Sequence, residues 1–191
     1  MPSLGAQLSP LLLTPEQAAS LDVHGRTDAA VLVPLFERHG DLHAVFTRRR
    51  DDLRRHAGEI SFPGGRRDPG DPDLGFTALR ETHEEIGLPP DGVELLGALQ
   101  PTPTFVTGYA IYPFVGLIEP GFEWIAADAE VAEVLELPLR DVRSGYARRR
   151  LIRRGLPFRT DAYQVGEHVI WGATARIVAD LLDRLERVRL A

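Results

Sequence analysis

A pair of adjacent glycines followed by a well-delimited helix limits the folds open to this chain more than any other pattern in its sequence. Gly64 and Gly65 allow a tight backbone turn that residues with a side chain adopt poorly. Asp73 is a favourable N-cap and Gly87 a favourable C-terminal stop, so the pattern predicts a helix over Leu74–Ile86. The sequence therefore predicts a turn and a helix placed against each other.

Three glutamates and one arginine give this helix an unusual charge pattern. Glu81 and Glu85 are expected about 40° apart around the helix, with Glu84 about 60° to the other side of Glu81. Like charges at these spacings cost about 0.2–0.5 kcal/mol per pair in an isolated helix. Arg80 lies four residues before Glu84 and is expected to hold it. The residues expected to face the core are Leu79, Thr82 and Ile86.

A bound divalent cation would offset the repulsion between these carboxylates and would indicate a metal site. A solvated acidic helix face is the simpler alternative. A calcium-binding loop starting at Asp71 is excluded, because Phe76 would occupy the position that requires glycine. Mg²⁺ or Mn²⁺, with open positions for phosphate oxygens, fits the oxygen ligands better.

The same residues resemble a known motif. Gly65, the acidic Asp71 six residues later and the run Arg80–Leu88 are similar to the Nudix box, found in hydrolases of nucleoside diphosphates linked to another moiety. The chain departs from that box in three places: Asp71 replaces a glutamate, one extra residue precedes Arg80, and Thr82 holds an apolar position.

The segment before the box narrows the resemblance. Thr47–Asp68 is similar to the upstream motif of the coenzyme A pyrophosphatase branch, which carries the same one-residue extension. Segments 106–109, 113–116 and 171–175 resemble this branch as well, so the resemblance covers roughly residues 29–182.

The resemblance implies a set of roles, which are predictions at this point. The metal ligands would be Glu81, Glu85, Glu84 and the Gly64 carbonyl. The catalytic residues would be Glu84, Arg80 and a later carboxylate, Glu130, with Glu133 as the alternative. The substrate-binding residues would be Arg49, Arg54, His56 and Arg66, although a solvated surface is the simpler explanation for each arginine taken singly, and His56 is as compatible with a role in organising its loop. The run Arg148–Arg150 with Arg153 and Arg154 is expected at the surface, with a phosphate clamp as the alternative.

The pattern of elements indicates an α+β fold, and the resemblance implies a Nudix-like α/β/α sandwich with the carboxylate helix packed on a mixed β-sheet. Strands are expected at residues 29–36, 43–48, 60–62, 93–99, 110–117 and 131–135, and further helices at 14–21 and 173–188. We expect a single domain over 1–191, with a core at about 29–182 and an N-terminal extension at 1–28.

Composition restricts the partners. The net charge of −6 disfavours a protein that binds nucleic acid by general attraction. The chain has no cysteine, and all 22 basic residues are arginine, so any phosphate clamp must use guanidinium groups. No apolar run is long enough to span a membrane, and Leu11–Leu13 is too short for a signal sequence, so a cytoplasmic location is expected. The apolar N-terminal segment and last helix suggest a possible homodimer.

Two rival functions remain open from the sequence. The first is a hydrolase of the same fold that acts on ADP-ribose, a dinucleotide or a nucleoside triphosphate. The second is a catalytically silent module that binds nucleotide or protein.

Overall fold

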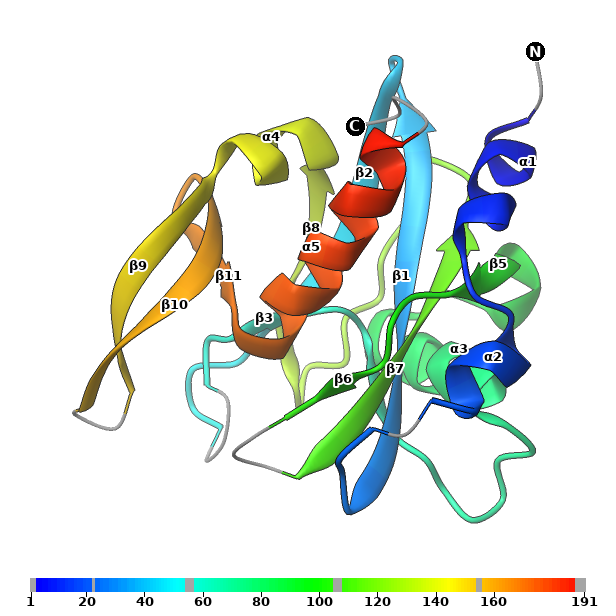
Figure 1. Ribbon diagram of the computed structural model, residues 1–191, viewed down its shortest axis with the longest axis horizontal. Helices are drawn as coiled ribbons and strands as arrows, with labels where there is room; N and C mark the ends of the chain where they lie inside the picture. Colours follow the sequence, from blue (N-terminus) through cyan, green and yellow to red (C-terminus); the bar gives the residue numbers. More distant parts are fainter. Residues whose placement is uncertain (1–2, 22, 54–56, 105–107, 154–155, 188–191) are drawn as a thin grey trace.

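The computed structural model describes residues 3–21, 23–53, 57–104, 108–153 and 156–187 (Figure 1). The helices are α1 (Leu4–Leu8), α2 (Pro15–Ala19), α3 (Leu74–Ile86), α4 (Leu139–Ser144) and α5 (Gly172–Glu186), with short 3-10 helices at Ser9–Leu11 and Pro90–Gly92. The strands are β1 (Thr27–Arg38), β2 (Asp41–Arg49), β3 (Ile60–Ser61), β4 (Gly64–Arg66), β5 (Glu94–Ala98), β6 (Thr102–Pro103), β7 (Tyr109–Leu117), β8 (Val131–Pro138), β9 (Tyr146–Arg153), β10 (Leu156–Val165) and β11 (His168–Trp171).

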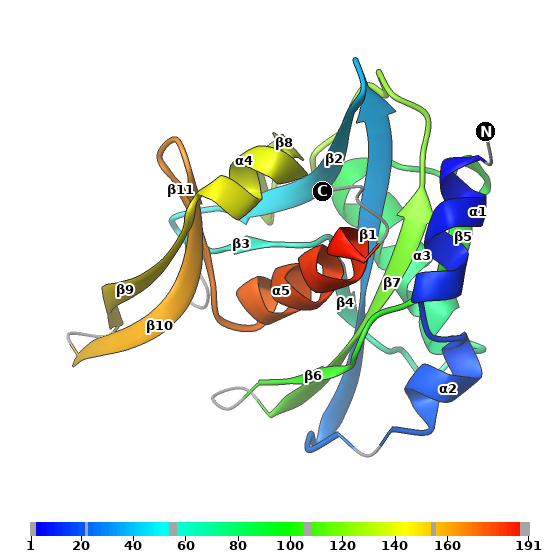
Figure 2. The same ribbon diagram turned by 45° about the horizontal axis from the view of Figure 1, so that its top comes forward.

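The centre of the molecule is a mixed sheet with the order β3-β2-β1-β7-β5. β1 pairs parallel with β7 and antiparallel with β2, while β4, β6 and β8 add to β1, β7 and β2. Alternate residues of β1 enter different cores: Val33 and Leu35 pack on the side of α5, and Leu32 and Phe36 on the side of α3. Since both faces of the sheet are covered by helices (Figure 1, Figure 2), the predicted α+β sandwich is confirmed.

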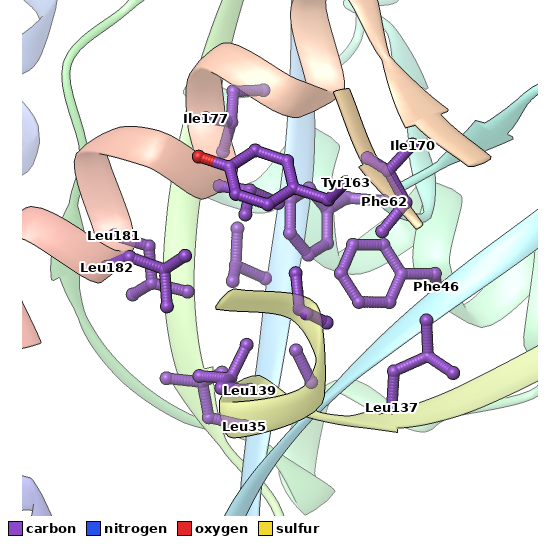
Figure 3. Packing of buried hydrophobic residues seen from close by; sticks show 14 of the residues in the cluster. Leu35, Phe46, Phe62, Leu137, Leu139, Tyr163, Ile170, Ile177, Leu181 and Leu182 are labelled. Atoms are coloured by element: carbon purple, nitrogen blue, oxygen red, sulfur yellow. The ribbon is translucent and has the colours of Figure 1, made fainter. Parts of the chain in front are cut away.

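A second sheet, with the order β11-β10-β9, is joined to the main body by shared packing. Tyr163 of β10 and Ile170 of β11 belong to the same hydrophobic cluster as Ile177 of α5 and Phe46 of β2 (Figure 3). Beyond this anchor, β9 and β10 extend away from the central sheet as a hairpin (Figure 1).

Helix α3 has the predicted bounds and ends. The side chain of Asp73 accepts a hydrogen bond from the Phe76 N–H at 2.8 Å, and Gly87 has a φ of 76° as the helix stops. Thr82 is buried although it is polar, because its hydroxyl donates to the Ala78 carbonyl at 2.7 Å. This internal bond explains how threonine can hold an apolar position of the box.

Ile86 is buried as expected, while Leu79 is only partly buried and packs at the margin of its cluster. The residues of α3 that reach the interior and were not expected there are Gly75, Thr77, Ala78 and Glu85.

Other elements differ from the sequence prediction. The predicted helix 14–21 is shorter, at Pro15–Ala19, with Thr14 and Gln17 forming a capping box. The last helix spans Gly172–Glu186, so it begins one residue earlier and ends two residues earlier than the predicted range 173–188. Helices α1 and α4 and the β9–β10 hairpin were not predicted, because their apolar residues show no sustained period.

The apolar residues that suggested subunit pairing are used inside the chain. Leu8 is 2% exposed, and Leu181 of α5 is 1% exposed, both in the same core cluster. Within the described residues, no helix is both long and apolar enough to cross a membrane.

Candidate active site

The glycine pair brings the carboxylate helix into contact with the backbone of β4. The Gly64 N–H donates to Oε2 of Glu85 at 3.1 Å, while Gly64 itself is paired with Val31 of β1. A Cβ at Gly64 would overlap the backbone of β1, and its φ of 149° also disfavours a side chain. At Gly65, an added Cβ would instead overlap the carboxylate of Glu81. Both glutamates therefore lie directly against β4.

Arg80 is the centre of an ion-pair network with the neighbouring carboxylates. Its Nε and Nη2 donate to the two carboxylate oxygens of Asp71 at 3.0 and 2.9 Å. Its Nη1 donates to Glu81 at 3.0 Å and to Glu84 at 3.2 Å. The predicted contact between Arg80 and Glu84 is thus present, and the same guanidinium also holds Glu81.

Asp71 fixes Arg80 from a buried position. The Asp71 residue is 6% exposed and also accepts from the Thr77 hydroxyl at 2.9 Å and the Asp68 N–H at 3.0 Å. The Arg80 hydrogen bonds, with smaller contributions from these donors, hold the pKa of Asp71 well below its usual range. The acid that departs from the Nudix box therefore positions the arginine of the box.

Glu85 is the most buried of the three glutamates, with 8% of the residue exposed. Burial raises the pKa of Glu85 to about 7, against the opposing effects of the Gly64 N–H and of Arg49. Arg49 is 3.9 Å from Glu85 and 3.2 Å from Glu130, so it lies between the two carboxylates.

Strand register gives the two later carboxylates, Glu130 and Glu133, different arginine partners. The pairing of β2 with β8 shifts between Arg48 and Arg49, which are opposite Glu133 and Val131. Arg48 consequently pairs with Glu133 at 3.4 Å, and Arg49 with Glu130 at 3.2 Å. Glu130 therefore shares Arg49 with Glu85 of α3, whereas Glu133 pairs with Arg48.

The donor set has the chemistry of a site for a hard divalent cation. Burial raises the pKa of Glu81 as well as that of Glu85, so two neighbouring carboxylates have lost hydration that a cation would replace. Among the residues that the structure describes, no three acidic or histidine side chains converge in a form that would hold a metal ion. In this structure carboxylate oxygens of Glu81 and Glu84 form ion pairs with Arg80.

A cavity of about 690 Å³ opens beside the glycine pair. Its walls come from β1, β2, β3, β4, β7, β10, β11 and the start of α5. They combine apolar and aromatic side chains with arginines. The lining residues include Arg49, Glu59, Phe62, Gly64, Gly65, Arg66, Tyr109, Phe158, Thr160, Trp171 and Arg176.

The predicted substrate residues divide into two groups. Arg49 and Arg66 line the cavity, whereas Arg54 and His56 lie outside the described residues, as do positions 106–107. Sequence reasoning assigned no role to Tyr109 and Trp171, although both lie in segments that carry the family resemblance. Phe158 and Arg176 were missed, because no motif marks them.

Comparison with known proteins identifies the family of this chain. The NUDIX domain family model matches residues 26–155. An uncharacterized Nudix hydrolase, NudL of Enterobacter sp. (strain 638), is 40% identical over 172 residues, covering 89% of this chain and 88% of the relative. The chain belongs to the Nudix hydrolases, enzymes of nucleoside diphosphate derivatives that generally use divalent metal ions.

Solved structures share the fold at low sequence identity. A MutT/nudix family protein of Enterococcus faecalis superimposes with a TM-score of 0.56 at 17% identity, covering 97% of this chain and 70% of that one. The NUDIX domain of Shewanella oneidensis NrtR, complexed with ADP ribose, gives 0.55 at 17% identity, covering 89% and 97%.

Proposed function

We propose that this Nudix hydrolase cleaves the pyrophosphate bond of coenzyme A or one of its derivatives, giving 4′-phosphopantetheine and adenosine 3′,5′-bisphosphate. The observation that carries the proposal is the cavity that runs from the glycine pair to an arginine- and aromatic-lined wall. Much of it is built by Thr47–Asp68, the segment that resembles the coenzyme A branch; its members at the cavity are Arg49, Glu59, Ile60, Ser61, Phe62, Gly64, Gly65 and Arg66.

In this proposal Glu81 and Glu85 are the principal ligands of Mg²⁺ or Mn²⁺, with Glu84 as a third ligand or as the residue that holds a metal-bound water. The Gly64 carbonyl completes the protein ligands. When bound, the cation would stabilise charge on the phosphoryl oxygens and lower the pKa of a bound water. Glu84 is suited to an outer role because its side chain is 58% exposed, against 20% for Glu81.

The other residues act on charge and on the proton. Arg80 keeps Glu84 and Glu81 oriented through the contacts described above, and Asp71 keeps Arg80 in place. Arg49 and Arg66 would neutralise the pyrophosphate oxygens from the cavity wall. Glu130, 3.2 Å from Arg49, would take the proton of the attacking water. Arg54 and His56, in the same motif, are proposed as further substrate contacts.

Two alternatives can be compared with this proposal. The Shewanella oneidensis NUDIX domain binds ADP ribose, which makes ADP-ribose the natural competing substrate. A catalytically silent module would gain nothing from the buried Glu85, whose burial raises its pKa to about 7. Burying a carboxylate costs free energy, and a module without catalytic activity would have no use for that cost. The buried Glu85 therefore disfavours the silent alternative.

A substrate panel tests the proposal. Purified protein would be incubated with coenzyme A, dephospho-coenzyme A, ADP-ribose and a nucleoside triphosphate, each with Mg²⁺, Mn²⁺ or chelator, and the products would be separated and identified. We expect preferential, cation-dependent release of 4′-phosphopantetheine from coenzyme A. Equal turnover of ADP-ribose and coenzyme A would refute the substrate assignment, and cation-independent turnover would refute the metal assignment.

A further inference from the structure

The arginine run on β9 does not form one continuous surface patch. Side chains of a strand point alternately to its two faces. In β9, Arg148 and Arg150 are exposed, as are Tyr146 and Ile152 on the same face, whereas Arg149 is half-buried. Arg149 therefore points to the opposite face from its two arginine neighbours, which corrects the expectation that the whole run lies at the surface.

The face that carries Arg149 is the one that lines the cavity. In the β9–β10 pairing Arg149 is opposite Thr160, and the next residue on that face of β10, Phe158, packs against Trp171 with ring centroids 5.6 Å apart. Thr160, Phe158 and Trp171 all line the cavity. Because Cβ atoms of directly opposed residues are about 5 Å apart, the longer Arg149 side chain begins beside the cavity wall.

A donor of Arg149 lacks an acceptor. Its Nε is buried and has no hydrogen-bond partner, and within the described chain the other buried side-chain atom in this state is Nε of Arg49, which lines the same cavity. Among the described residues no carboxylate forms an ion pair with Arg149. A buried donor without an acceptor costs free energy. The Nε atoms of Arg49 and Arg149 therefore indicate that a bound ligand supplies the missing acceptors.

We propose that Arg149 binds a phosphate monoester of the substrate that is separate from the pyrophosphate. If the proposed function is correct, this phosphate monoester is the 3′-phosphate of coenzyme A, so this identification rests on the proposed function. Arg49 and Arg66 lie next to the glycine pair and the carboxylates, where the pyrophosphate must react, whereas Arg149 belongs to the hairpin wall. A guanidinium fork matches the oxygens of a phosphate monoester, so Arg149 selects nucleotides that carry a ribose phosphate.

The test compares Arg149→Gln with Arg150→Gln, its exposed neighbour in the same strand. Steady-state kinetics are measured on coenzyme A and on dephospho-coenzyme A, which differ only in the 3′-phosphate. We expect Arg149→Gln to raise KM for coenzyme A by about 10- to 100-fold, the effect of losing a charge-assisted hydrogen bond, with kcat little changed. KM for dephospho-coenzyme A should stay within about twofold, and Arg150→Gln should change neither.

Equal loss on both substrates, no loss on either, or the same loss in Arg150→Gln would overturn the assignment. If the wild-type protein hydrolyses neither compound, the proposed function fails. The role of Arg149 is then tested separately, by measuring nucleotide binding. Calorimetric titration with adenosine 3′,5′-bisphosphate and with AMP should show tighter binding of the bisphosphate, with the difference lost in Arg149→Gln. Equal binding of the two nucleotides by the wild-type protein would refute the subsite; thermal melting confirms that each variant is folded.

Discussion

Replacing Glu85 by glutamine should make the metal-free protein more stable and the enzyme inactive. Burial raises the pKa of Glu85 from 4.5 to about 7, so the folded state binds a proton more tightly than the unfolded state. Stability is therefore lost as the pH rises from about 4.5 to about 7. At about 1.4 kcal/mol per pKa unit, keeping this carboxylate charged costs about 3 kcal/mol above pH 7. Glutamine keeps an oxygen for the Gly64 N–H but carries no charge to desolvate.

The assay is denaturant unfolding of the wild type and Glu85→Gln at pH 5 and pH 8, with chelator and with Mg²⁺. In chelator at pH 8 we expect the variant to be more stable by about 3 kcal/mol, and at pH 5 by less than about 1 kcal/mol. Mg²⁺ should stabilise the wild type and leave the variant unchanged. Glu84→Gln is the matched control, because its exposed side chain gains nothing from losing its charge. A destabilised Glu85→Gln, or one that Mg²⁺ still stabilises fully, would refute the reasoning.

Three further substitutions separate the roles in the site. Gly65→Ala should displace the Glu81 carboxylate, lowering kcat/KM by more than about tenfold in a cation-dependent assay, while its melting temperature changes little because the overlap is with the end of a side chain and not with backbone. Glu130→Gln should lower kcat by about 10²- to 10⁴-fold, whereas Glu133→Gln should retain wild-type kcat, and the reverse order would exchange their roles. Asp71→Asn should destabilise the protein at pH 7 by about 1–3 kcal/mol in guanidinium unfolding; since the pKa of the native aspartate is lowered, the difference should begin to shrink as the pH falls below about 4 and vanish only below the lowered pKa.

The elements that the sequence predicted well are those that neighbouring residues specify. Helix α3 has the predicted bounds because Asp73 satisfies a free N–H at one end and Gly87 adopts the left-handed conformation at the other. The contact between Arg80 and Glu84 was equally accessible, since residues four apart lie on one helix face. The β9–β10 hairpin has no comparable local pattern, because its arginine run masks the alternation of exposed and half-buried residues.

The amino-acid pattern alone indicates a turn, a delimited helix, three glutamates on neighbouring faces of that helix, and a resemblance to the Nudix box. The depth at which each glutamate is buried follows from tertiary packing, because it depends on the approach of β4 to the helix at Gly64 and Gly65. Tertiary packing likewise decided that Asp71 anchors the arginine of the box. The burial of the glutamates depends on a contact between α3 and β4, which are separate elements. The register of a strand, and the face to which each side chain points, are fixed only when such elements pack together.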